Sequence, residues 1–139
     1  MPALQTLDLA GNKLTGTLPA SWSNLSMLTT LVIGSCSFTG PLPEEWTSAP
    51  GLARLTTLDA RYNQLSSLPG GKWDGLPLLG TLNLNDNNFS SSLPEGTLPA
   101  VWAQQMPFLS DVEANFNYHL TGAEECHLPD LFSPIAISS

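Results

Sequence analysis

The side chains best suited to acid–base or metal chemistry gather near the C-terminus of the 139-residue chain. Histidine, cysteine and carboxylate groups bind zinc, and an oriented histidine beside a serine would support nucleophilic catalysis. Their spacing matches no known ligand pattern, and the chain contains no G-x-S-x-G motif and no phosphate-binding glycine loop. The sequence therefore predicts no catalytic, cofactor-binding or metal site, and no enzyme activity. The residues considered are His119, Glu124, Glu125, Cys126, His127 and Asp130.

A five-residue motif, Leu-Pro-x-x-Trp, recurs along the chain and gives the strongest indication of its fold. It occupies residues 18–22, 42–46 and 98–102, and it returns with one extra residue at 68–73. All four tryptophans of the chain lie in this position of the motif. A short unit repeated in this way is typical of a solenoid, in which each repeat packs against its neighbours.

The pattern upstream of each tryptophan is Leu-x-x-Leu-x-Leu-x-x-Asn-x-Leu, in units that start at about residues 4, 28, 55, 79 and 109. Its Leu-x-Leu centre alternates with period two, which predicts a short strand with one buried face. One such strand cannot bury its leucines alone, so we expect the copies to stack as a parallel sheet. The asparagine falls in the following turn, where its amide would satisfy buried backbone groups. The expected ladder is Asn12, Cys36, Asn63, Asn87 and Asn117, with Cys36 as an interruption.

These units resemble the plant-specific class of leucine-rich-repeat proteins, whose repeat is close to LxxLxxLxLxxNxLxGxLPxxLxxL. The resemblance covers about residues 3 to 122, and the tryptophan variant is similar to green-algal members. It implies an α/β-type leucine-rich-repeat solenoid, a right-handed horseshoe. A parallel β-sheet would line its concave face, and irregular and 3₁₀ segments its convex face. We expect the tryptophans to cover the apolar gaps between neighbouring turns on the convex side.

We interpret residues 1–139 as one leucine-rich-repeat domain, cut from a longer array, with 123–139 as a degenerate C-terminal segment. The N-terminal residues enter a repeat almost at once, without a capping helix. The ends of the leucine columns are therefore expected to be partly exposed. The positions concerned are Leu7, Leu9, Phe132 and Ile135.

The charge of the chain bears on its partners. Twelve acidic and four basic residues give a net charge of −8, whereas nucleic-acid binding requires a basic patch. No apolar run reaches membrane-spanning length. We therefore expect no nucleic-acid partner and no direct membrane insertion of this piece.

Two features concern covalent chemistry. Cys36 and Cys126 belong to distant turns, so the stacking of repeats should hold them beyond disulfide reach and leave both unpaired. Asn24 and Asn88 each begin an Asn-x-Ser sequon and are candidate glycosylation sites. Chance sequons are also expected in a repeat this rich in asparagine and serine.

The variable residues around each Leu-x-Leu centre are expected on the concave face, because strand side chains alternate. The framework repeats while these positions change, which favours a tailored binding surface on a fixed scaffold. Tyrosine and arginine often anchor interfaces. In the alternative interpretation the polar residues only keep the sheet soluble, and Tyr62 and Phe116 pack into the turns. The candidate binding residues are Asp59, Arg61, Tyr62, Asn83, Asn85, Asp86, Asp111, Glu113 and Phe116.

These observations favour a non-catalytic module that binds a protein or peptide. The excess of acidic side chains on the concave face favours a partner with a basic or amide-rich segment. Resemblance to receptor-like and secreted repeat proteins implies an extracellular or cell-surface location. The alternative is an intracellular scaffold of cytoskeletal or axonemal type, in the cytoplasm or the cilium.

Overall fold

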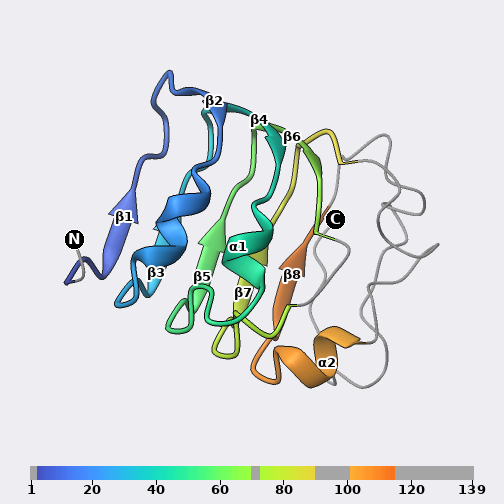
Figure 1. Ribbon diagram of the computed structural model, residues 1–139. Coiled ribbons are helices and arrows are strands. Elements are labelled where there is room, and N and C mark those ends of the chain that lie inside the picture. The colour runs from blue at the N-terminus through green and yellow to red at the C-terminus, as the bar shows by residue number, and fades with distance from the viewer. Residues whose placement is uncertain (1–2, 70–72, 90–100, 115–139) are drawn as a thin grey trace.

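The Leu-x-Leu segments form the strands of a parallel sheet. The computed structural model describes residues 3–69, 73–89 and 101–114. Within these residues five strands of three residues each are hydrogen-bonded in the order β1-β3-β5-β7-β8 (Figure 1). They are β1 (Thr6–Asp8), β3 (Thr30–Val32), β5 (Thr57–Asp59), β7 (Thr81–Asn83) and β8 (Asp111–Glu113).

The strands stack in strict register, which aligns their central apolar residues in one column. The column consists of Leu7, Leu31, Leu58, Leu82 and Val112. All of these except Leu7 are buried. Parallel stacking thus converts one inward leucine per strand into a continuous core, and the predicted leucine-rich-repeat solenoid is confirmed.

A second parallel sheet, of three strands, follows the asparagine turns and was not predicted from the sequence. It comprises β2 (Thr15–Thr17), β4 (Ser37–Pro41) and β6 (Gln64–Ser67), hydrogen-bonded in the order β2-β4-β6. Gly40 has a φ of 78°, and a Cβ there would lie 3.0 Å from the Thr17 side chain. Glycine at this position therefore relieves both backbone strain and crowding between rungs.

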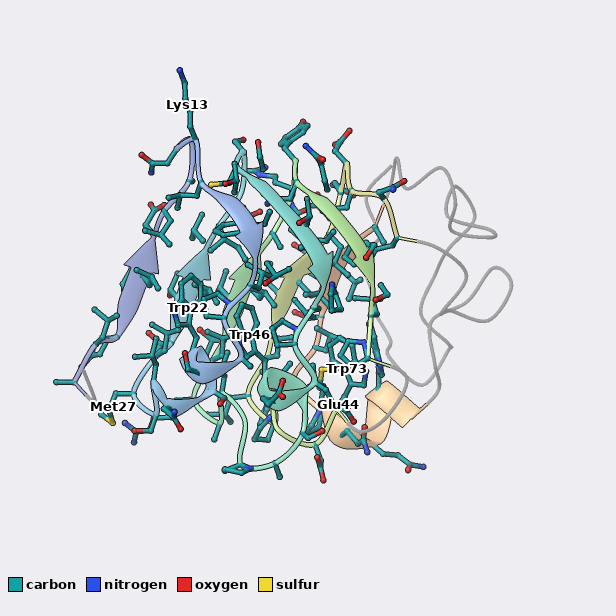
Figure 2. All side chains as sticks on the ribbon, turned by 45° about the horizontal axis from the view of Figure 1, so that its top comes forward. Lys13, Trp22, Met27, Glu44, Trp46 and Trp73 are labelled. Carbon is teal, nitrogen blue, oxygen red and sulfur yellow. The ribbon has the colours of Figure 1, made fainter. Side chains whose placement is uncertain are left out.

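Three of the four tryptophans lie in short helical segments on the convex side, where Figure 2 labels Trp22 and Trp46. The 3₁₀ helix η1 (Ala20–Asn24) contains Trp22. The helices α1 (Glu44–Thr47) and α2 (Val101–Gln105) contain Trp46 and Trp102. Pro19 and Pro43 are the N-cap residues of η1 and α1, and both are extended. Proline is tolerated at a helix start because the N–H that it lacks would have no partner inside the helix.

The indole rings pack in pairs between neighbouring turns. The rings of Trp22 and Trp46 are stacked with centroids 5.8 Å apart, and those of Trp73 and Trp102 lie 4.5 Å apart at a tilt of 47°. Trp46, Trp73 and Trp102 are buried, whereas Trp22 is only half-buried. The tryptophans therefore fill the convex gaps, as the sequence predicts.

The asparagine ladder joins each turn to the preceding repeat. Asn63 is 8% exposed; its Nδ2 donates to Ile33 O at 2.8 Å and to Ala60 O at 3.1 Å, and its Oδ1 accepts the Phe38 N–H at 3.1 Å. Asn87 repeats this arrangement one rung further along, with its Nδ2 2.9 Å from Ala60 O. Buried backbone groups of two successive repeats are thereby satisfied by one side chain.

The ladder departs from expectation at its N-terminal end. Cys36 does not fully interrupt it, because its thiol donates to Leu9 O at 3.3 Å, the acceptor position that Asn63 uses on Ile33. Asn12 is exposed and bonds only within its own turn, to Leu9 O at 2.8 Å and Ala10 O at 3.3 Å. Asn117 lies outside the described residues.

The first repeat buries its leucines less well than the following ones. Leu7 and Leu9 are half-buried, as predicted, and Leu14 is exposed. Phe132, Ile135 and Cys126 fall outside the described residues, so the exposure predicted for the first two and the unpaired state predicted for Cys126 stay predictions. Cys36 has no disulfide partner among the described residues. Within residues 3–69, 73–89 and 101–114, no helix is long and apolar enough to cross a membrane.

Candidate functional site

The outward side chains of the five-stranded sheet form two columns on its concave face. The residues before the central leucine align as one column: Thr6, Thr30, Thr57, Thr81 and Asp111. The residues after it align as the second: Asp8, Val32, Asp59, Asn83 and Glu113. The first column is thus rich in hydroxyl groups and the second in carboxylates.

The concave arginine is held by an ion pair within its own repeat. Arg61 Nε lies 3.2 Å from Asp59 Oδ2, and the Arg61 N–H donates to Asp59 Oδ1 at 3.2 Å. Arg61 is half exposed, so solvent screens the attraction and the pair adds little to stability. The pair does fix the guanidinium over β5 and compensates its charge locally.

Three polar residues from two repeats form a second concave cluster. Glu113 Oε2 accepts the Asn85 Nδ2–H at 2.6 Å and the Asn83 Nδ2–H at 3.1 Å. Asn83 Oδ1 in turn accepts the Asn85 N–H at 3.1 Å. Asn83 is only 7% exposed, so it positions its neighbours rather than offering a contact of its own. Glu113 faces outward with its second oxygen as an acceptor.

The turn after each strand presents further candidates. Tyr62 and Asp86 have positive φ angles of 54° and 55°, as the turn requires. The Tyr62 side chain is 54% exposed, so it does not pack into the turn as the alternative interpretation expects. Its N–H donates to Asn85 O at 3.0 Å, which ties the turn to the next repeat. Phe116 lies outside the described residues.

Acidic groups dominate the concave surface. Asp8 bonds its Oδ1 to the Ala10 N–H at 3.0 Å and keeps its other oxygen toward solvent. Arg61 is the one basic residue among the candidates, and Asp59 already pairs with it. The carboxylates of this surface are Asp8, Asp59, Asp86, Asp111 and Glu113. The surface therefore offers mainly hydrogen-bond acceptors and negative charge.

The two sequon asparagines are both exposed. Asn24 ends η1 on the convex side, and Asn88 follows the buried ladder residue Asn87. Both side chains are therefore accessible, and glycosylation at these positions stays a prediction. The histidine-containing segment at 119–130 lies outside the described residues.

Sequence reasoning missed a groove on the convex side. It has a volume of about 390 Å³ and runs across three successive Leu-Pro steps, beside the helix α1. The recurring Leu-Pro step could have indicated this groove, because a proline interrupts the hydrogen bonding between neighbouring turns. The lining residues include Leu18, Leu42, Leu68, Pro43, Glu44 and Glu45.

Two stacked parallel sheets, asparagine ladders and a short repeat together define a leucine-rich-repeat solenoid. Family models agree: one described as Leucine Rich Repeat matches residues 3–25 and 27–49, and one described as Leucine Rich repeats (2 copies) matches 53–99. The chain is therefore a leucine-rich-repeat protein. The green-algal affinity of the tryptophan variant stays a prediction.

Solved structures of plant proteins share this fold. The leucine-rich-repeat ectodomain of the receptor kinase SOBIR1 from Arabidopsis thaliana is 24% identical, with a TM-score of 0.65 over 91% of this chain and 60% of that one. The GASSHO1/SCHENGEN3 ectodomain from the same plant is 25% identical, with a TM-score of 0.67 over 91% of this chain and 15% of that one. A plant ice-binding protein is 26% identical, with a TM-score of 0.69 over 98% of this chain and 40% of that one. This chain thus spans at most 60% of the length of these proteins.

Proposed function

We propose that the chain is a non-catalytic recognition module whose concave sheet binds an extended protein or peptide segment. The observation that carries this proposal is the excess of carboxylate groups on the concave face. Acidic acceptors from β5, β8 and the turns share one surface, and its arginine is already paired with Asp59. Receptor ectodomains with the same fold support it, since the GASSHO1/SCHENGEN3 structure is a complex with CASPARIAN STRIP INTEGRITY FACTOR 2.

The partner that fits this surface carries lysine, arginine or amide donors along an extended backbone. Such a partner would meet the carboxylates of Asp8 and Glu113 and could stack an apolar or cationic side chain against the exposed Tyr62 ring. Because the attraction is electrostatic and solvent-exposed, its association rate should fall as salt rises.

Selection from a displayed library of random peptides tests this proposal. We expect the recovered peptides to be rich in lysine and arginine. Asp59→Asn with Asp111→Asn should weaken their binding by about tenfold at low salt, because two charges are lost and Arg61 becomes uncompensated. Glu44→Gln with Glu45→Gln removes the same charge from the convex side and should leave the affinity within about twofold. Recovery of neutral or acidic peptides, or loss of binding only in the convex variant, would contradict the concave assignment.

An extracellular or cell-surface location fits this function best, because the similar structures are receptor ectodomains. Exposed sequon residues Asn24 and Asn88 are compatible with that compartment. The intracellular scaffold remains the alternative. A scaffold would bind a partner fixed in an assembly, and the same concave variants would then release the chain from that assembly.

We infer ice binding as a second candidate function from the threonine column, defined as Thr6, Thr30, Thr57 and Thr81. These residues pair in register across four strands, which are spaced about 4.8 Å apart in a parallel sheet. A row of alternating hydroxyl and methyl groups at constant spacing offers a regular template for ordered water. Similarity to the plant ice-binding protein, over 98% of this chain, favours this candidate.

Inhibition of ice recrystallisation tests the second candidate. The parent chain should slow crystal growth, and Thr30→Lys with Thr57→Lys should abolish the effect, because bulky charged groups would break the row. Thr15→Lys with Thr17→Lys changes exposed threonines of the other sheet and should retain the effect. If the parent chain does not inhibit recrystallisation, ice binding is excluded. If only Thr15→Lys with Thr17→Lys abolishes the inhibition, the ice-binding surface belongs to the other sheet.

A further inference from the structure

The groove on the convex side lies where the second sheet ends, beside the Leu-Pro steps of three successive turns. The Leu42 N–H donates to Ser67 O at 2.9 Å, and the next residue, Pro43, has no N–H to continue the ladder. Pro19 and Pro69 occupy the same step of the neighbouring turns. The backbone ladder therefore ends at this point, and the groove lies across the turns there.

The floor and rim of the groove differ in chemistry. Its floor is made by the buried leucines Leu18, Leu42 and Leu68. Its rim carries Glu44 and Glu45, both exposed at the start of α1, and Glu44 is labelled in Figure 2. Among the residues that the structure describes, no basic side chain lines the groove. The groove is therefore apolar with an acidic rim, and it is separate from the candidate residues of the concave face.

We propose that this groove binds a short extended peptide in which one or two proline or leucine residues precede lysine or arginine. The apolar residues would cover the leucine floor, and the basic residues would meet Glu44 and Glu45. Three turns span roughly 10 Å, which matches about three extended residues. The partner's flanks would be basic rather than acidic, because the described part of the rim carries the two carboxylates of Glu44 and Glu45.

The indole of Trp46 provides a reporter for this site. Its Nε1–H donates at 2.9 Å to the carbonyl oxygen of Pro19, between the lining residues Leu18 and Ala20. A ligand in the groove should therefore shift the indole N–H resonance, which Trp46→Phe would assign. The probe is the basic peptide acetyl-Leu-Pro-Leu-Lys-Lys-amide. The control is an acidic peptide of the same length, in which Glu-Glu replaces Lys-Lys.

We expect a saturable shift with the basic peptide, and affinity at least about tenfold lower for the acidic one. Glu44→Gln with Glu45→Gln should weaken the basic peptide about fivefold. Ala20→Trp should abolish its binding by filling the groove, since Ala20 is exposed and lines it. Asp59→Asn with Asp111→Asn should leave the affinity unchanged, because these residues belong to the concave face.

Equal affinity for the two peptides would overturn the proposal, as would binding that survives Ala20→Trp. Loss of binding in the concave variant alone would assign the peptide to the concave sheet instead. The concave function is tested with different peptides and variants, so either site can fail while the other stands.

Discussion

Replacing Trp46 by alanine should destabilise the solenoid by about 4 kcal/mol, the typical cost of deleting a buried tryptophan. The side chain is 1% exposed, its ring stacks on Trp22, and its N–H bonds to Pro19 O in the preceding repeat. The substitution therefore opens a cavity between two turns and removes one of the two hydrogen bonds to Pro19 O, which keeps only the Trp22 N–H at 3.2 Å. Urea unfolding followed by circular dichroism measures the change.

Two further variants make this expectation specific. Trp22→Ala removes a half-buried ring of the same stack and should cost less than half as much, because less surface returns to water. Trp46→Phe keeps an aromatic ring but loses the hydrogen bond, and should cost about 1–2 kcal/mol. If Trp46→Ala fails to fold, the Trp46→Phe variant can still be compared with Trp22→Ala. Equal costs at the two tryptophans would show that Trp46 does not hold the turns together.

Replacing Asn63 by alanine should lower the free energy of unfolding by about 3 kcal/mol, the second large effect that we expect. The substitution leaves the Phe38 N–H and the Ile33 carbonyl without their partner inside the array. Buried polar groups that lose a partner cost more than the bond itself contributes. Thermal unfolding, compared with the parent chain under identical conditions, gives the difference.

Asn12→Ala provides the matched control for the ladder. It removes the same side chain at the equivalent turn position, where the amide is exposed and bonds only within its own turn. We expect a cost below about 1 kcal/mol, since water replaces the lost bonds. Coinciding melting curves for Asn63→Ala and the parent would refute the ladder as a source of stability.

The strands of the first sheet could be predicted from the sequence because their burial is strictly periodic. The second sheet could not, because its first strand has no buried face: Leu14 and all of β2 are exposed. Glycine in such a run predicts a turn, yet Gly16 pairs in register with Phe38 of β4, which is buried. Packing between rungs thus overrides the local preference.

The concave site could be predicted by position but not by accessibility. Alternation places Asp59 and Asn83 outward, yet Asn83 is buried because Glu113 of the next repeat covers its amide. Tyr62 proved exposed for the opposite reason, since its left-handed backbone directs the ring away from the core. The burial of Asn83 depends on a contact between repeats and the exposure of Tyr62 on a backbone conformation, and the repeat pattern specifies neither.

Amide resonances recorded during titration with a selected lysine- and arginine-rich peptide test the central claim most directly. The concave assignment predicts that the largest shifts fall on β5, β7 and β8 and on the turn at Tyr62, with saturation that weakens as salt rises. Residues of η1 and α1 should stay unchanged. Shifts confined to η1 and α1, with the concave strands unaffected, would contradict the assignment of recognition to this face.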